Sequence, residues 1–331
     1  MKNKYVFVAI MLCCILLISG LLTGVYVNQN NASDEDDNFV IVTSFYPMYI
    51  ATLNVVKDVP GVTLKNLSEP QTGCLHDFQL TPEDMKLLST ADVFITNGGG
   101  IEAFMEQIAS AYPNLVIIEA SEGIELLCEE HTQEEEHIEA GEESYDEDHE
   151  DDKHIHDGHN HDVNAHAWMS VSSYRKQVDN IAKNLKELNP ANCVEFERNL
   201  AEYNEKLASL EGQQQELQEL ISSQSVILFH SAFAYVAKDY GMYIEYCMDL
   251  DEERQVSAGE VANVLFVIDT KGVSYIIAEE LYGKGMCETI QQEADVTVIY
   301  LDPLTRGEYE ADSYIEAMSR NIQVIMEAFL K

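Results

Sequence analysis

Three histidines of the chain have the residue type and the positions expected of metal ligands. His76 and His166 each precede a helical pattern, and His230 directly follows a short apolar run. Neutral imidazole nitrogen suits zinc, whereas manganese and magnesium favour carboxylate oxygen. Each histidine alone could have a structural role. Because the three lie on two separate halves of the chain, together they predict zinc ligands that meet across a cleft.

The other seven of the ten histidines lie in one acidic segment, residues 129–162. This segment lacks apolar periodicity, which predicts a disordered loop. We expect the loop to gather zinc weakly and to pass it to the three-histidine site, since carboxylates attract cations and neutral imidazoles bind them transiently. A solvated acidic spacer is the alternative.

The net charge of the chain is −40, from 19 Lys and Arg against 59 Asp and Glu. A surface this acidic repels nucleic acid and attracts cations. Nucleic acid is therefore not an expected partner.

Short apolar runs alternate with helical patterns along both halves of the chain. The predicted strands are residues 39–43, 92–96, 115–118, 225–229, 273–277 and 296–300. Such alternation predicts an α/β fold with mainly parallel sheets and helices on their faces. Ligands bind at loops that follow the carboxyl ends of such strands, which is the predicted position of His230. An amphipathic helix is expected to close the chain over residues 312–330.

A long charged segment with apolar residues at three- and four-residue steps separates the two halves. Residues 191–221 predict one helix, about 45 Å long at 1.5 Å per residue. We interpret it as a rigid strut between an N-terminal lobe, 38–190, and a C-terminal lobe, 222–331; a surface helix or short coiled coil is the alternative.

The first 37 residues predict a signal or an N-terminal membrane anchor with a polar tether. Lys2 and Lys4 precede an uncharged stretch, residues 5–27, whose length suits both. No cysteine closely follows this stretch, so an uncleaved anchor is favoured over a lipid anchor. Either version places the rest of the chain outside the cytoplasm. Of the five cysteines there, Cys247 and Cys287 could form one disulfide.

Five motifs resemble those of the solute-binding proteins of zinc-uptake ABC importers, in the family's order. The first is Leu75-His-Asp-Phe-Gln-Leu-Thr-Pro-Glu-Asp84, and the second resembles the family's strand and glycine turn, over residues 91–104. The others are Asn164-Ala-His-Ala-Trp-Met169, Phe229-His-Ser-Ala-Phe233 and Leu301-Asp-Pro-Leu304. The similarity extends from about residue 38 to the end of the chain.

The resemblance implies two α/β lobes joined by one long rigid helix, with one zinc ion buried between them. It assigns His76, His166 and His230 as ligands and gives the fourth position to a carboxylate or water. Asp302, in the last motif, is the candidate carboxylate, and Glu279 is the second. It further implies a monomer that is not an enzyme and that delivers zinc to an ABC permease and, indirectly, its ATPase subunit. Asn164 is a departure, since an acidic residue is commoner there.

Three other functions are alternatives. A manganese- or iron-binding homologue would keep the fold and change the ion. A zinc-dependent adhesin or metal-buffering surface protein would work without a permease. A zinc hydrolase could use three histidines and a water, but the sequence has no His-Glu-x-x-His helix and no evident general base beside the ligands.

Overall fold

The computed structural model describes residues 38–68, 78–128, 163–248, 250 and 256–330. The expected anchor, His76 and the histidine-rich segment 129–162 lie outside the described residues. Within the described part of the chain, no helix is both long and apolar enough to cross a membrane.

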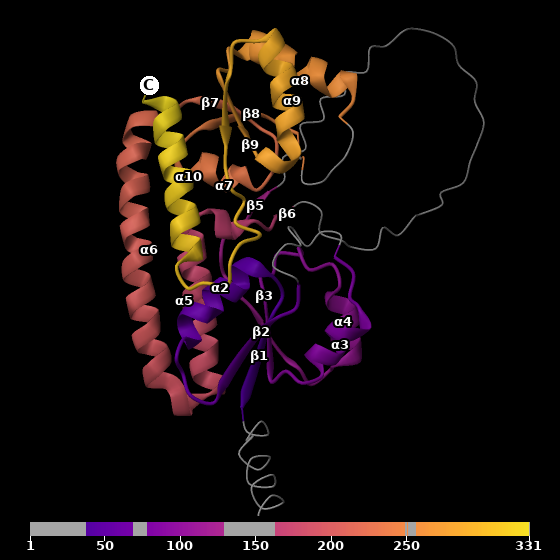
Figure 1. Ribbon diagram of the computed structural model, residues 1–331, viewed down its shortest axis with the longest axis vertical. Helices are drawn as coiled ribbons and strands as arrows, with labels where there is room; N and C mark the ends of the chain where they lie inside the picture. The colour runs from indigo at the N-terminus through magenta and orange to yellow at the C-terminus, as the bar shows by residue number, and fades with distance from the viewer. Residues whose placement is uncertain (1–37, 69–77, 129–162, 249, 251–255, 331) are drawn as a thin grey trace, which may run out of the picture.

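The N-terminal lobe contains a four-stranded sheet in which every neighbouring pair is parallel. Its order is β2-β1-β3-β4, and its strands are β1 (Phe39–Thr43), β2 (Val62–Asn66), β3 (Val93–Thr96) and β4 (Val116–Glu119). The accompanying helices are α2 (Tyr46–Val56), α3 (Pro82–Leu88), α4 (Met105–Ala111) and α5 (Val171–Leu188). Figure 1 shows this lobe at the end of the molecule where the described chain begins.

The C-terminal lobe repeats this plan with a second parallel sheet, in the order β10-β9-β7-β8. Its strands are β7 (Ser225–Leu228), β8 (Tyr243–Cys247), β9 (Tyr275–Ala278) and β10 (Thr297–Tyr300). Its helices are α7 (Phe233–Asp239), α8 (Ala258–Lys271) and α9 (Glu280–Glu293). The expected α/β class with two parallel sheets is confirmed.

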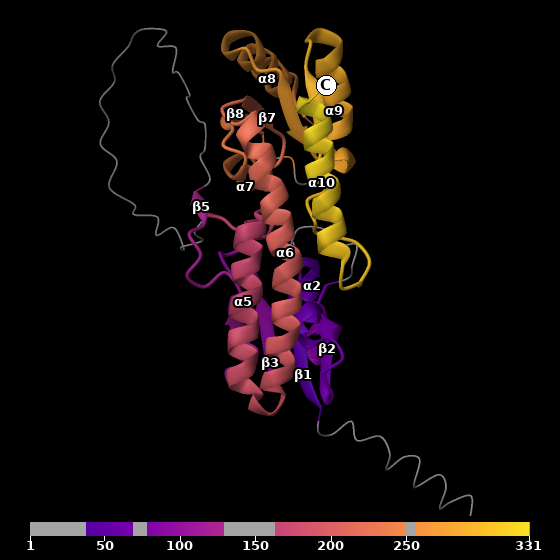
Figure 2. The same ribbon diagram turned by 90° about the vertical axis from the view of Figure 1, so that its left-hand side faces the viewer.

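One long helix, α6 (Cys193–Ile221), extends along both lobes, as Figures 1 and 2 show from two sides. Its 29 residues correspond to about 43 Å. A short 3-10 turn, η2 (Pro190–Asn192), precedes it. Its buried positions include Tyr203, Leu207 and Leu210 at helical spacing, and it packs against α2, α5 and α10 (Ser313–Phe329). The predicted joining helix is therefore present.

The segment before α10 forms a second connection between the lobes. After β10 the chain returns to the N-terminal lobe, where Tyr309 stacks on Tyr49 with ring centroids 4.1 Å apart. Asn54 Nδ2 donates a hydrogen bond to Ala311 O at 2.8 Å, and the Tyr46 hydroxyl donates one to Glu308 O at 3.0 Å. Because the lobes are joined twice, α6 is not the only restraint on their relative motion.

A two-stranded antiparallel hairpin lies between the lobes in Figure 1. It pairs β5 (Leu127–Cys128) with β6 (Val163–Asn164), with Leu127 opposite Asn164 and Cys128 opposite Val163. The residues that flank segment 129–162, Cys128 and Val163, consequently lie side by side.

The disulfide considered between Cys247 and Cys287 is wrong, because neither cysteine is part of a disulfide. Cys247 lies on the edge strand β8, whereas Cys287 belongs to α9, which packs over β9 and β10. Desolvation raises the pKa of the buried Cys287 thiol to about 12 and keeps it protonated.

Candidate metal centre

The fold brings His166 and His230 together although they are 64 positions apart in the sequence. His166 follows β6 and begins the 3-10 turn η1 (Ala167–Met169), and His230 lies between β7 and α7. The ring centroids are 5.1 Å apart with the planes at 77°. Each residue is only 1 % exposed. Two of the three expected ligands, one from each lobe, therefore form a buried pair.

Asn164 fixes the protonation pattern of the His166 ring. Its Oδ1 accepts a hydrogen bond from the His166 main-chain N–H at 3.1 Å, and its Nδ2 donates to Ser231 O at 2.7 Å. These two main-chain partners determine which way the amide points. Oδ1 also lies 2.9 Å from His166 Nδ1, so Nδ1 must carry the proton. The lone pair of the neutral ring is then on Nε2, the arrangement that a metal ligand needs.

His230 has the opposite arrangement. Its Nδ1 accepts a hydrogen bond from the Ala232 main-chain N–H at 3.0 Å. The proton of the neutral ring is therefore on Nε2. This tautomer has no lone pair on Nε2, so metal binding through Nε2 would require the ring to rotate or its proton to move to Nδ1.

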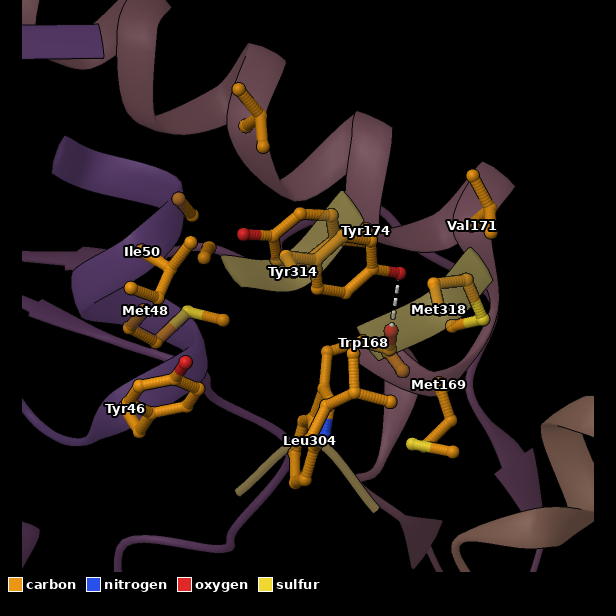
Figure 3. Packing of buried hydrophobic residues seen from close by; sticks show 14 of the residues in the cluster. Tyr46, Met48, Ile50, Trp168, Met169, Val171, Tyr174, Leu304, Tyr314 and Met318 are labelled. Carbon is orange, nitrogen blue, oxygen red and sulfur yellow. Dashed lines mark hydrogen bonds between the residues drawn. The ribbon is translucent and has the colours of Figure 1, made fainter. Parts of the chain in front are cut away.

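Trp168 packs beside His166 and contacts both lobes. Its ring centroid lies 5.0 Å from that of His166 and 5.1 Å from that of Phe45. Its Nε1 donates a hydrogen bond to Pro303 O at 2.9 Å, and its main-chain oxygen accepts one from the Tyr314 hydroxyl at 2.8 Å. Figure 3 shows this second bond, with Tyr314 lying over Tyr174. The residue next but one to His166 is thus held by the last loop and helix of the chain.

A buried polar network supports the same segment from the N-terminal lobe. Glu102 accepts hydrogen bonds from Ser44 Oγ, Asn97 N and Gly98 N at 2.7–3.2 Å. Burial raises the pKa of Glu102 to about 7, although these donated bonds act in the opposite direction. The Asn97 side chain in turn donates to Ala165 O at 2.9 Å. Glu102 therefore positions the turn that holds the residue before His166.

Gly99 allows this turn to approach the site closely. Its φ is +71°, and a Cβ atom at this position would lie 2.8 Å from Leu126 Cδ1 and 3.2 Å from Ala165 Cβ. Both the left-handed backbone and the close contact exclude a side chain.

The two carboxylates considered as the fourth ligand have other partners. Asp302 Oδ1 accepts a hydrogen bond from Leu304 N at 2.8 Å. Glu279 is 7 % exposed and forms an ion pair with Arg306 at 3.0 Å. Within the described residues, no group of three or more His, Cys, Asp or Glu side chains could hold a metal ion. His76 lies outside them, so the complete ligand set stays a prediction.

Sequence reasoning assigned no role to Trp168, Glu102 or Arg306. Trp168 and Glu102 stand inside motifs quoted above, but a motif does not reveal a hydrogen-bond partner. The ion pair of Arg306 with Glu279 joins residues 27 positions apart, and no local pattern indicates it.

Comparison with known proteins shows the family to which the chain belongs. The sequence profile of the ZnuA family, described as the periplasmic component A of a zinc-uptake complex, matches residues 41–328. The chain belongs to this family. Its members are substrate-binding proteins of ABC uptake systems and not enzymes, so the chain is an extracytoplasmic metal-binding solute-binding protein.

Relatives in this family bear the names of different metals. The chain is 29 % identical to the high-affinity zinc uptake system protein ZnuA of Bacillus subtilis, covering 100 % of this chain and 99 % of that protein. It is 25 % identical to the iron-binding protein YfeA of Yersinia pestis, covering 95 % and 94 %. The manganese complex of the solute-binding protein FpvC of Pseudomonas aeruginosa has a TM-score of 0.71 at 25 % identity, with 88 % and 98 % coverage.

Proposed function

We propose that this protein captures zinc outside the cytoplasm and delivers it to an ABC permease. The observation that carries the proposal is the buried pair of His166 and His230, contributed by separate lobes. Two imidazole ligands favour zinc over manganese, which prefers carboxylate oxygen. The resemblance to a protein named for zinc uptake supports the same ion.

We propose His76, His166 and His230 as the three protein ligands. The fourth position then belongs to Asp302 or to water, because Arg306 holds the Glu279 carboxylate. In the Nδ1–H tautomer of the neutral His166 ring, the lone pair that a metal would need is on Nε2. The proposed ion stays the cargo of the protein, and no reaction on a substrate is involved.

A zinc titration against a competing chelator tests the proposal on the full-length chain. The parent should bind one zinc ion tightly, and manganese should not match it. His166→Ala and His230→Ala should each weaken this binding by about 100-fold or more, since a ligand is lost. His149→Ala, within the acidic segment, is the matched control and should leave the tight site unchanged.

Two results would contradict the proposal. Tight zinc binding that survives both substitutions would remove these histidines from the site. Tighter binding of manganese or iron than of zinc would support the alternative ion that two of the relatives are named for.

A further inference from the structure

The Asn164 side chain contacts both His166 and the turn that carries His230. Its Oδ1 contacts His166 through the main-chain N–H and Nδ1, and its Nδ2 donates to the carbonyl of Ser231, the residue that follows His230. Asn164 is 2 % exposed, so these bonds form without competition from solvent. One amide group therefore connects the segment that carries His166 with the turn that carries His230.

The hairpin that carries Asn164 makes further hydrogen bonds to the C-terminal lobe. The Tyr235 hydroxyl on α7 donates to Asn164 O at 2.7 Å and accepts from Leu127 N at 3.1 Å. From the N-terminal lobe, Asn97 holds the next residue, Ala165, through its carbonyl. The residues around His166 are consequently fixed by hydrogen bonds from both lobes.

An amide can make this set of contacts and a carboxylate cannot. The two oxygens of an aspartate at position 164 could still accept from His166 N and Nδ1. No N–H would remain to donate to Ser231 O, and a carboxylate oxygen would face that carbonyl instead. Asn164→Asp therefore separates orientation of His166 from attachment to the other lobe.

We propose that Asn164 is a positioning residue with two functions. Its oxygen selects the His166 tautomer. Its nitrogen donates the hydrogen bond to Ser231 O, here called the clasp, that holds the lobes together before metal binds. The clasp keeps His166 and His230 adjacent in the metal-free protein, so little lobe closure is left for the ion to drive. The relevance of this clasp to zinc rests on the proposed function. The tautomer and the clasp themselves do not.

The test uses the full-length metal-free protein and three variants: Asn164→Asp, Asn164→Ala and Asn180→Asp. Asn180 is the matched control, because its amide also donates to main-chain oxygens, those of Ala120 and Glu122, at 2.9 Å. The first measurement is the ¹⁵N NMR spectrum of the histidine rings, which distinguishes the two neutral tautomers. The second is hydrogen exchange at the Leu127 amide, whose bond to Tyr235 joins the lobes.

In the parent, His166 should show a single Nδ1–H tautomer and Leu127 should exchange slowly. Asn164→Asp should keep the tautomer and raise the exchange rate at Leu127 by about tenfold, as expected for the loss of one hydrogen bond. Asn164→Ala should lose both the single tautomer of His166 and the slow exchange at Leu127. Its zinc affinity should fall by about 10- to 100-fold, as for other partners of metal ligands. Asn180→Asp should change neither measurement.

Each half of the proposal can be overturned separately. Unchanged exchange at Leu127 in Asn164→Asp would refute the clasp. A single Nδ1–H tautomer retained in Asn164→Ala would refute selection of the tautomer. Both readings come from metal-free protein, so they stand apart from a failure of the zinc proposal, which would appear as a parent chain without a tight zinc site.

Discussion

The Trp168 indole and the Pro303 carbonyl, 135 positions apart in the sequence, form a hydrogen bond of 2.9 Å across the two lobes. Pro303 directly follows Asp302, and Trp168 lies beside His166. A single side chain thus touches a predicted ligand and the loop that carries the candidate fourth ligand. Trp168 is also the chain's one tryptophan, which makes it a specific spectroscopic probe.

Zinc binding should change the fluorescence of Trp168. A cation at His166 alters the electric field at an indole whose ring centroid is 5.0 Å from the imidazole. Titration of the parent should show a change that saturates at one equivalent of tightly bound zinc, and His230→Ala should show none at the same concentration. A parent that binds zinc tightly without any change in emission would contradict the predicted position of the ion.

Replacement of the two candidate carboxylates should separate their roles. Asp302→Asn retains an oxygen that can accept from Leu304 N, so the turn survives while the charge is lost. We expect roughly tenfold weaker zinc binding or worse if Asp302 is a ligand, and at most about a threefold change for Glu279→Gln. Competition with a chelator measures both. The reverse ranking would assign the fourth position to Glu279.

Glu102→Gln should flatten the pH dependence of stability. The ordinary pKa of this carboxyl is 4.5, and burial raises it to about 7. The folded state therefore binds the proton more tightly than the unfolded state, and the contribution of Glu102 to the free energy of unfolding is present below pH 4.5. This contribution, on the order of 3 kcal/mol, is lost as the pH rises to about 7.

Urea unfolding of the parent and of Glu102→Gln between pH 4.5 and 7.5 measures this effect. Asp239, whose pKa burial raises to about 6, is present in both proteins and cancels in the difference. Two parallel pH profiles would show that Glu102 does not titrate in this window.

Deletion of residues 131–161 should leave the tight zinc site intact and remove weaker zinc equivalents. The deletion is compatible with the fold because Cys128 and Val163 are paired neighbours in the hairpin. Equilibrium dialysis should show a stoichiometry that falls toward one, and uptake at scarce zinc should slow. Loss of the tight site would place it in the deleted segment, whereas unchanged stoichiometry and uptake would make that segment a spacer.

Whether a strand or helix could be predicted from the sequence depends on how its residues are buried. The strands β1 and β3 and the helix α6 were anticipated, because buried strands give continuous apolar runs and a packed helix gives apolar residues at steps of three and four. Two of the four edge strands, β2 and β8, were not, whereas β4 and β10 were. The residues of β2 and β8 are mostly half-buried or exposed, and polar residues interrupt both strands, so neither contains a continuous apolar run.

The sequence by itself determined the α/β class, the joining helix and the three histidines as candidate ligands, since these depend on local pattern and residue type. Only the tertiary structure decided that His166 and His230 are buried neighbours. It also decided that Asn164 orients one ring, that Ala232 places the proton of the other, and that Arg306 holds Glu279. These relationships depend on hydrogen-bond geometry and burial between segments distant in the chain, which the order of residues does not encode locally.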